Sequence, residues 1–176
     1  MNRTTIIGAV VLAFFAAGCG RHSANVDGSA NSTPAAGNSG GTSFSLRLAG
    51  VDRGDFVSAT MRIKAVQVAS GAAVLASTVK TPEVNLAEMS QAYLMTSFQV
   101  PADTEDVDFL VSFEGGTVST EKESFNVDSR CQTLRIAGKM SRIAERKHAV
   151  IHLDLARSFV PSAAGVMLVP HFQLVY

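Results

Sequence analysis

The 176-residue sequence contains no tryptophan, two tyrosines and two cysteines. It therefore lacks the aromatic platforms on which proteins stack sugar rings or nucleic-acid bases. It also has no excess of charge, because 15 Lys and Arg residues balance 15 Asp and Glu residues. No global electrostatic field favours nucleic acid or another polyanion as a partner.

Several catalytic motifs are absent as well. The sequence has no H-E-x-x-H zinc motif, no C-x-x-C redox motif and no phosphate-binding loop. Each of these motifs places reactive or ligating groups at the spacing that a helix or a turn requires. Their absence predicts a protein that is not an enzyme and has no cofactor.

The apolar run near the N-terminus is short. It covers residues 6–17 and follows Arg3. A transmembrane helix needs about 20 apolar residues, whereas the apolar region of a secretion signal takes about 7 to 15. We therefore predict a signal peptide and not a membrane-spanning helix.

Small residues end this run directly before a cysteine: Ala16, Ala17 and Gly18 precede Cys19. This segment resembles the bacterial lipobox. The resemblance implies that residues 1–18 are removed and that Cys19 is acylated, with chains such as palmitate, and held in a lipid bilayer. In enteric lipoproteins an Asp after the cysteine favours the inner membrane, so Gly20 implies the outer membrane of a bacterial cell envelope. An ordinary secretion signal with an incidental Cys19 is the alternative.

The segment that follows has the composition of a flexible linker. Within residues 20–42, only Arg21, His22, Val26 and Asp27 are not Gly, Ala, Ser, Asn, Thr or Pro. Such a segment cannot bury a core, and a coil of about 23 residues spans roughly 25 to 30 Å. We predict that residue 19 and this disordered linker, together residues 19–42, connect the anchor to a domain at residues 43–176.

The domain carries the two-residue period of β-strands. In its first segment, for example, Phe44, Leu46 and Leu48 fall on one face. No helical stripe is sustained, so we predict an all-β fold: an antiparallel β-sandwich of about seven to nine strands, immunoglobulin-like or transthyretin-like. The expected strands lie at residues 43–48, 57–68, 72–79, 84–86, 107–113, 117–127, 131–140, 148–155 and 166–176.

Local patterns refine the first half of the domain. The apolar face changes between Ile63 and Val66, which predicts a β-bulge. Gly115 and Gly116 predict the tight turn of a hairpin, because glycine readily adopts positive φ angles. Residues 87–98 are less regular and are expected to form a helical turn or an irregular crossover.

Two expectations concern the second half. Residues 131–140 and 148–155 are expected to pair as a hairpin around a turn at residues 141–147. Residues 166–176 are expected to form one terminal strand. Because Pro170 cannot donate a ladder hydrogen bond, this strand should lie at an edge or contain a bulge.

Three short motifs resemble the bacterial domain-of-unknown-function family 4382. The matching residues are Pro101, Ala102 and Thr104 in the first motif, Asp154 and Ser158 in the second, and Leu168 and Pro170 in the third. The segments MRIKAVQV and VNLAEM are also similar to that family. Asp103, Glu105 and His152 depart from its usual residues. The resemblance implies an exported β-sandwich domain, often carried by lipoproteins, with no established biochemical role.

The segment 148–158 contains the strongest candidate for a metal site. In a strand, His148, His152 and Asp154 share one face, with His152 and Asp154 about 7 Å apart. These two are weak candidate metal ligands if neighbouring strands add others. The alternative is a solvated strand face, with Asp154 and Ser158 bonding local backbone amides where the strand ends.

Two clusters of charged residues are further candidate sites. Residues 103–108 are acidic and have Glu114 at the twelfth position of a calcium-loop count, but Asp108 stands where an EF-hand needs glycine. An exposed acidic turn is the expectation, and calcium binding is the alternative. The basic cluster consists of Lys139, Arg142, Arg146 and Lys147. It is expected to be a solvated hairpin, with anionic headgroups as the alternative contact.

Cys131 has no partner for an intrachain disulfide if Cys19 carries lipid. It is then buried and inert, or available for an intermolecular bridge. Nucleophilic catalysis with His148 or His152 as the base is the remaining alternative.

These observations predict a lipid-anchored envelope protein whose domain binds or scaffolds. Its partners would be the bilayer, through acylated Cys19, and an envelope protein or glycan, without nucleic acid. A zinc- or calcium-dependent enzyme or metal-binding module at His148, His152 and Asp154 is one alternative. A carbohydrate-binding sandwich is another, although tryptophan is absent.

Overall fold

The computed structural model describes residues 42–128, 133–163 and 165–176. These residues belong to one compact unit, Ser39–Tyr176. The elements are β1 (Ser43–Val51), β2 (Ser58–Ser70), β3 (Ala73–Ala76), β4 (Glu83–Asn85), β5 (Tyr93–Gln99), β6 (Asp106–Ser119), β7 (Ser124–Asp128), β8 (Thr133–Lys139), α1 (Met140–Arg146), β9 (His148–Asp154), α2 (Leu155–Ser158), β10 (Phe159–Ser162), β11 (Gly165–Leu168) and β12 (Phe172–Val175).

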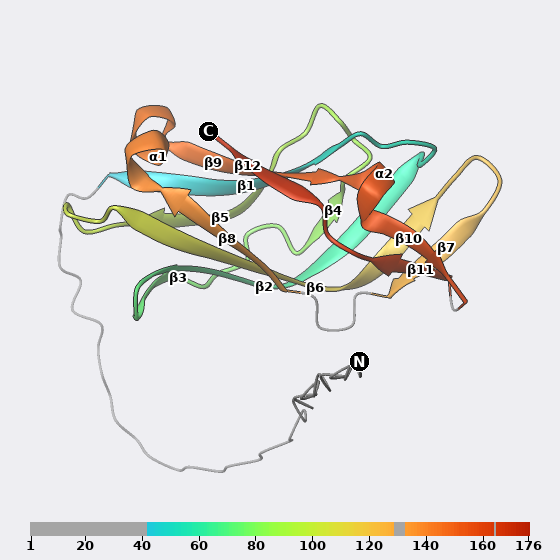
Figure 1. Cartoon of the computed structure of the whole chain (residues 1–176), viewed down its shortest axis with the longest axis horizontal. Coiled ribbons are helices and arrows are strands. Elements are labelled where there is room, and N and C mark those ends of the chain that lie inside the picture. The colour runs from blue at the N-terminus through green and yellow to red at the C-terminus, as the bar shows by residue number, and fades with distance from the viewer. Residues whose placement is uncertain (1–41, 129–132, 164) are drawn as a thin grey trace, which may run out of the picture. The chain divides into compact units, whose positions relative to one another are not determined.

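The strands form two sheets, which confirms the all-β sandwich (Figure 1). The expected number of seven to nine strands is too low, because the described residues form twelve strands, several of them only three or four residues long. One sheet has the order β12-β9-β1-β5. The other has the order β10-β11-β7-β6-β2-β3, with β4 also paired to β2 and β8 also paired to β6. The expectation of purely antiparallel sheets is wrong at two places, because β1 pairs parallel with β9 and β11 pairs parallel with β7. Parallel pairs need long crossover connections, which local sequence patterns do not reveal.

A single hydrophobic core lies between the sheets. Phe98 of β5 links them: its ring centroid lies 5.8 Å from that of Phe44 in its own sheet and 5.7 Å from that of Phe109 in the other sheet. Phe44, Leu46 and Leu48 are buried, as the alternation in β1 predicts. The buried core residues all lie within this unit. A compact unit with its own core is able to fold independently.

The predicted bulge in β2 is confirmed. The register between β2 and β6 shifts between Arg62 and Ile63 and again between Ile63 and Ala65. Lys64 and Ala65 are consequently exposed, while Ile63 and Val66 are both buried.

The predicted turn at Gly115 and Gly116 is wrong. Strand β6 continues through both glycines to Ser119, and the turn lies at residues 120–123. A Cβ atom at Gly116 would clash with the carbonyl oxygen of Thr60 and lie 2.7 Å from the Sδ atom of Met61. Glycine is therefore present because β2 approaches closely, which is the other common reason for glycine inside a strand.

Residues 87–98 are more regular than expected, because most of their second half forms β5, the outer strand beside β1. A hydrogen bond from the backbone N–H of Lys80 to the carbonyl of Met95 covers part of the other edge of β5.

The predicted hairpin between residues 131–140 and 148–155 is also wrong. Strand β8 pairs with β6 in one sheet, whereas β9 pairs with β1 and β12 in the other. Helix α1 makes the crossing, and its Met140 and Ile143 side chains are buried. These two apolar side chains fill the end of the core from a helix and do not belong to a hairpin.

The expectation of one terminal strand over residues 166–176 is wrong for a similar reason. Strands β11 and β12 belong to different sheets, and Pro170 lies in the connection between them. The buried Ser158 holds this connection: its hydroxyl oxygen accepts a hydrogen bond from the N–H of His171 at 2.9 Å and lies 3.3 Å from the carbonyl oxygen of His171, to which the hydroxyl donates.

We expect Ser158→Ala to lower the free energy of unfolding by about 1 to 3 kcal/mol, because it removes the hydroxyl that pairs the backbone of His171. Ser162→Ala is the matched control, since the exposed Ser162 hydroxyl makes one 3.3 Å bond to Gly165. Urea unfolding of both variants measures the difference. Equal stability of the two variants would contradict the role of Ser158.

We expect Thr96→Val to raise the free energy of unfolding, by about 1 kcal/mol. The Thr96 hydroxyl is buried and has no hydrogen-bond partner among the described residues, and an unpaired buried hydroxyl is costly. Urea unfolding again provides the measurement. A loss of stability would show that the hydroxyl is satisfied, for instance by a buried water molecule.

Candidate functional site

Strand β9 presents its polar residues as the alternation predicts. Ala149, Ile151 and Leu153 are buried, and His152 and Asp154 lie on the opposite face of the strand. His148 begins the strand, four residues before His152. At about 3.3 Å per residue this separates them by roughly 13 Å. The three residues of the metal alternative therefore do not converge on one ion.

Asp154 ends the strand in the way predicted. Its Oδ1 atom accepts a hydrogen bond of 3.0 Å from the N–H of Arg157, and its Oδ2 atom lies 3.5 Å from Nε of Arg157. His152 lines a hollow of about 250 Å³ with Asp154, Arg157 and His171 among its neighbours. Within the described part of the chain, no group of three or more His, Cys, Asp or Glu side chains is placed to hold a metal ion.

The acidic segment is only partly a turn. Asp106 and Asp108 belong to β6, where Asp106 lies 2.8 Å from Nζ of Lys139 and Asp108 lies 2.9 Å from a guanidinium nitrogen of Arg135. These contacts raise the pKa of Lys139 and of Arg135, in each case chiefly through the hydrogen bond. Both cations are exposed, so the ion pairs contribute little to stability.

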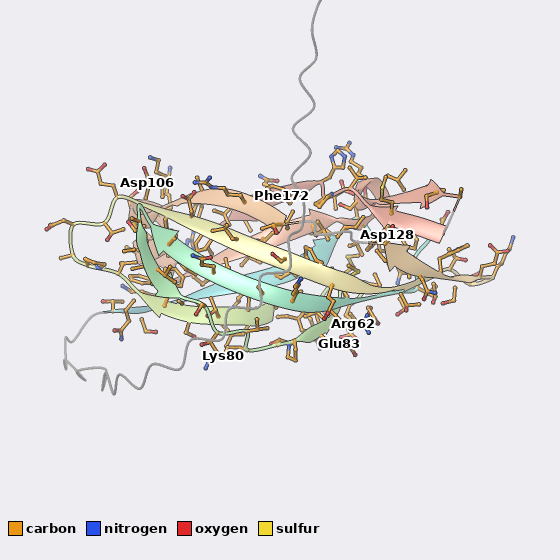
Figure 2. All side chains as sticks on the ribbon, turned by 90° about the horizontal axis from the view of Figure 1, so that it is seen from below. Arg62, Lys80, Glu83, Asp106, Asp128 and Phe172 are labelled. Atoms are coloured by element: carbon orange, nitrogen blue, oxygen red, sulfur yellow. The ribbon has the colours of Figure 1, made fainter. Side chains whose placement is uncertain are left out.

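The outer face of this sheet is polar. Arg62 of β2 and Glu83 of β4 lie side by side on it (Figure 2) and are paired in the register. Asp106 lies at the first residue of β6. Positive and negative side chains both occur on this face, so it does not form a patch of a single charge.

The basic cluster does not form the hairpin that was expected. Arg142 and Arg146 lie on α1, and Lys147 ends that helix with a positive φ of 62°. The ammonium group of Lys147 lies 5.5 Å from the centroid of the Phe44 ring. Lys139 is paired with Asp106, and no described ion pair involves Arg142, Arg146 or Lys147.

Cys19, the predicted linker apart from its last residue, and Cys131 lie outside the described residues. The pentapeptide at residues 37–41 has the spacing G-x-S-x-G and also lies outside them. That motif supports catalysis only on a turn between a strand and a helix. Among the described residues, no helix is both long enough and apolar enough to cross a bilayer.

Hollows occur at both ends of the sandwich. The hollow at the first end measures about 740 Å³ and lies where the chain enters β1. It is lined by Thr42, Phe44, Val100, Pro101, Ala102, Thr104, Glu105, Lys139, Met140, Ser141 and Ala144. It thus includes the first motif of the family resemblance.

The hollow at the other end is the better candidate site. We call it the apolar pocket. It measures about 610 Å³ and is lined by Gly54, Asp55, Phe56, Thr120, Phe125, Ala156, Phe159, Pro161, Ser162, Gly165 and Val166. The rings of Phe56 and Phe159 meet edge to face, with centroids 5.3 Å apart. Pockets of about 300 to 1,000 Å³ with mostly apolar walls and a few polar groups are typical of small-molecule sites.

A second hollow adjoins the apolar pocket. We call it the charged hollow. It measures about 470 Å³ and shares Gly54, Asp55, Phe56 and Thr120 with the apolar pocket. Its other lining residues are Arg53, Val57, Glu121 and Lys122. The two hollows therefore meet along one common wall.

No pattern in the sequence predicts this pair of hollows. Their walls come from the loop after β1, the turn after β6, and the segment from α2 to β11. In the sequence, Phe56, Phe125 and Phe159 of the apolar pocket each have neighbours that are typical of ordinary core or turn positions. The only local signal was the charged turn at residues 52–55, directly before Phe56.

No family model, curated protein or solved structure matches the chain. The resemblance to family 4382 and to the lipobox therefore stays a prediction from the residues that carry it.

Proposed function

We propose that the protein is a lipid-anchored lipoprotein of the bacterial cell envelope, in the outer membrane, whose β-sandwich binds a small apolar ligand without catalysing a reaction. The observation that carries the binding role is the apolar pocket, with its three phenylalanines. Acylation of Cys19 and the linker at residues 19–42 would supply the anchor and the reach.

The position of the apolar pocket supports this proposal. The chain enters β1 at Ser43 and leaves it at Val51, about 26 Å further on. The pocket wall at residues 54–56 follows directly. The start of β1 and the apolar pocket therefore lie at opposite ends of the sandwich (Figure 1).

The chemistry of the pocket supports binding over catalysis. Asp55 is the one ionisable side chain among the residues that line it. A hydroxyl nucleophile needs an adjacent base. The pocket hydroxyls of Thr120 and Ser162 are hydrogen-bonded to the carbonyls of Glu123 and Gly165, and no described hydrogen bond joins either of them to Asp55. The residues of the metal alternative, His148, His152 and Asp154, lie on β9 and do not line this pocket.

The anchor is tested with Cys19→Ala in the full chain. We expect this variant to leave the membrane fraction for the soluble periplasmic fraction and to lack the mass of the acyl chains. Cell fractionation and mass spectrometry give the two readouts. Unchanged membrane partition together with an unchanged mass would rule out the lipid anchor.

The pocket is tested on the unit Ser39–Tyr176, which contains the described core. We expect N-phenyl-1-naphthylamine, an uncharged fluorescent probe, to bind with micromolar affinity because its rings can pack on the phenylalanines. Ala156→Leu, which fills the pocket from α2, should weaken binding at least fivefold. Ala102→Leu places the same side chain in the hollow at the first end and should leave binding unchanged.

A pocket variant that binds the probe as well as the unchanged domain does would contradict the proposal. Stoichiometric zinc or calcium bound by the same purified domain would favour the metal alternative, and selective binding on a glycan array would favour the carbohydrate alternative.

A further inference from the structure

We infer that the apolar pocket and the charged hollow form one site for a single-chain amphiphile with a zwitterionic head group. This inference rests on the proposed function and names the class of ligand. The apolar pocket would hold the hydrocarbon chain, and the charged hollow would hold an ammonium group together with a phosphate group.

Continuity of the two hollows is the first step. Asp55 and Phe56 line both of them, so a ligand that extends from one hollow into the other passes this wall. On one side of the wall lie Phe125, Phe159 and Val166, which are apolar. On the other side lie charged residues. A bound molecule that fits both halves is therefore apolar at one end and polar at the other.

The balance of charge decides the kind of polar group. Arg53 and Lys122 are positive, and Asp55 and Glu121 are negative. All four side chains are exposed, and no described ion pair engages any of them. A head group of a single sign would meet as many repelling charges as attracting ones. A zwitterion can place each of its charges against an opposite one.

The wall shared by the two hollows is the favoured position for the ammonium group of the ligand. A cation there is attracted by the carboxylate of Asp55 and lies next to the Phe56 ring. Aromatic rings are a common binding partner of quaternary ammonium groups. The phosphate can then accept hydrogen bonds from Arg53 and Lys122. The chain continues from this wall toward Phe159.

The loop that carries Arg53 and Asp55 is fixed by backbone hydrogen bonds, one of which joins it to the end of β6, next to the turn of Glu121 and Lys122. Phe56 N–H donates to the carbonyl of Arg53 at 3.1 Å, and Val57 N–H donates to the carbonyl of Ser119 at 2.8 Å. Gly54 has a positive φ of 55°, and a Cβ atom there would lie 3.2 Å from Cβ of Ala156. Preorganisation of this kind lowers the entropic cost of binding.

Strand addition by a partner polypeptide is the occupant that this region disfavours. Strand β10 is the outermost strand beside the apolar pocket, and Pro161 lies within it. Proline has no N–H to donate and is a common protection of exposed sheet edges. A small amphiphile binds without main-chain hydrogen bonds to the edge of a sheet.

The test uses the unit Ser39–Tyr176 and four ten-carbon probes below their micellar concentrations: decylphosphocholine, decyltrimethylammonium, decyl sulfate and decanol. Isothermal titration calorimetry measures each dissociation constant at low ionic strength. We expect decylphosphocholine to bind at least fivefold more tightly than each of the other three probes, and Ala156→Leu to weaken its binding at least fivefold.

Charge variants locate the head group. Arg53→Gln and Asp55→Asn should each weaken the binding of decylphosphocholine about fivefold. Arg53 lines only the charged hollow, so Arg53→Gln should leave the binding of decanol unchanged. Arg142→Gln and Asp103→Asn make the same changes at exposed positions outside both hollows and should have no effect on either probe. Circular dichroism verifies that all variants are folded.

The outcomes separate the two proposals. Decanol binding as tightly as decylphosphocholine overturns the zwitterionic head group but leaves the apolar pocket of the proposed function in place. Tighter binding of either singly charged probe also overturns the head group. If none of the probes binds, and N-phenyl-1-naphthylamine does not bind, both proposals fail.

Discussion

Burial of two sheet faces against each other is the constraint on which the rest of this domain depends. Phe98 shows the arrangement most directly, since its ring contacts Phe44 in one sheet and Phe109 in the other. The inner faces of both sheets are buried by this packing, and the outer face of the larger sheet is polar. The ends, where loops cross from sheet to sheet, are left to form hollows. The position of the candidate site therefore follows from the sandwich itself.

The crossings between the sheets build these ends. Helix α1 carries the chain from β8 to β9 at the end where the domain begins. At the other end α2 leads from β9 into β10, and the Ser158 hydroxyl fastens the return through His171 to β12. The same crossing places Phe159 beside Phe56. The segment around Ser158 and Phe159 thus both connects the two sheets and forms part of the wall of the apolar pocket.

Local sequence patterns predicted the features that depend on residues close together in the chain. The alternation in β1 and β9 was confirmed, as was the bulge after Ile63, because a strand with one buried face must place apolar residues at every second position. The turn at Gly115 and Gly116 was wrong because a glycine serves equally for a turn and for the close approach of another strand. No residue of the candidate site was identified from the sequence, because its walls come from segments that are far apart in the chain.

By itself, the sequence determined that the described part of the domain is built mainly of strands around a β-sandwich core, since side-chain periodicity and apolar content are local properties. It also carries the lipobox-like segment that predicts an anchor. Only the tertiary structure decided which strands pair, where the chain changes sheets, and that Phe56, Phe125 and Phe159 line one pocket. Pairing and pocket formation join residues that are far apart in the chain, and their energies come from contacts that no short segment contains.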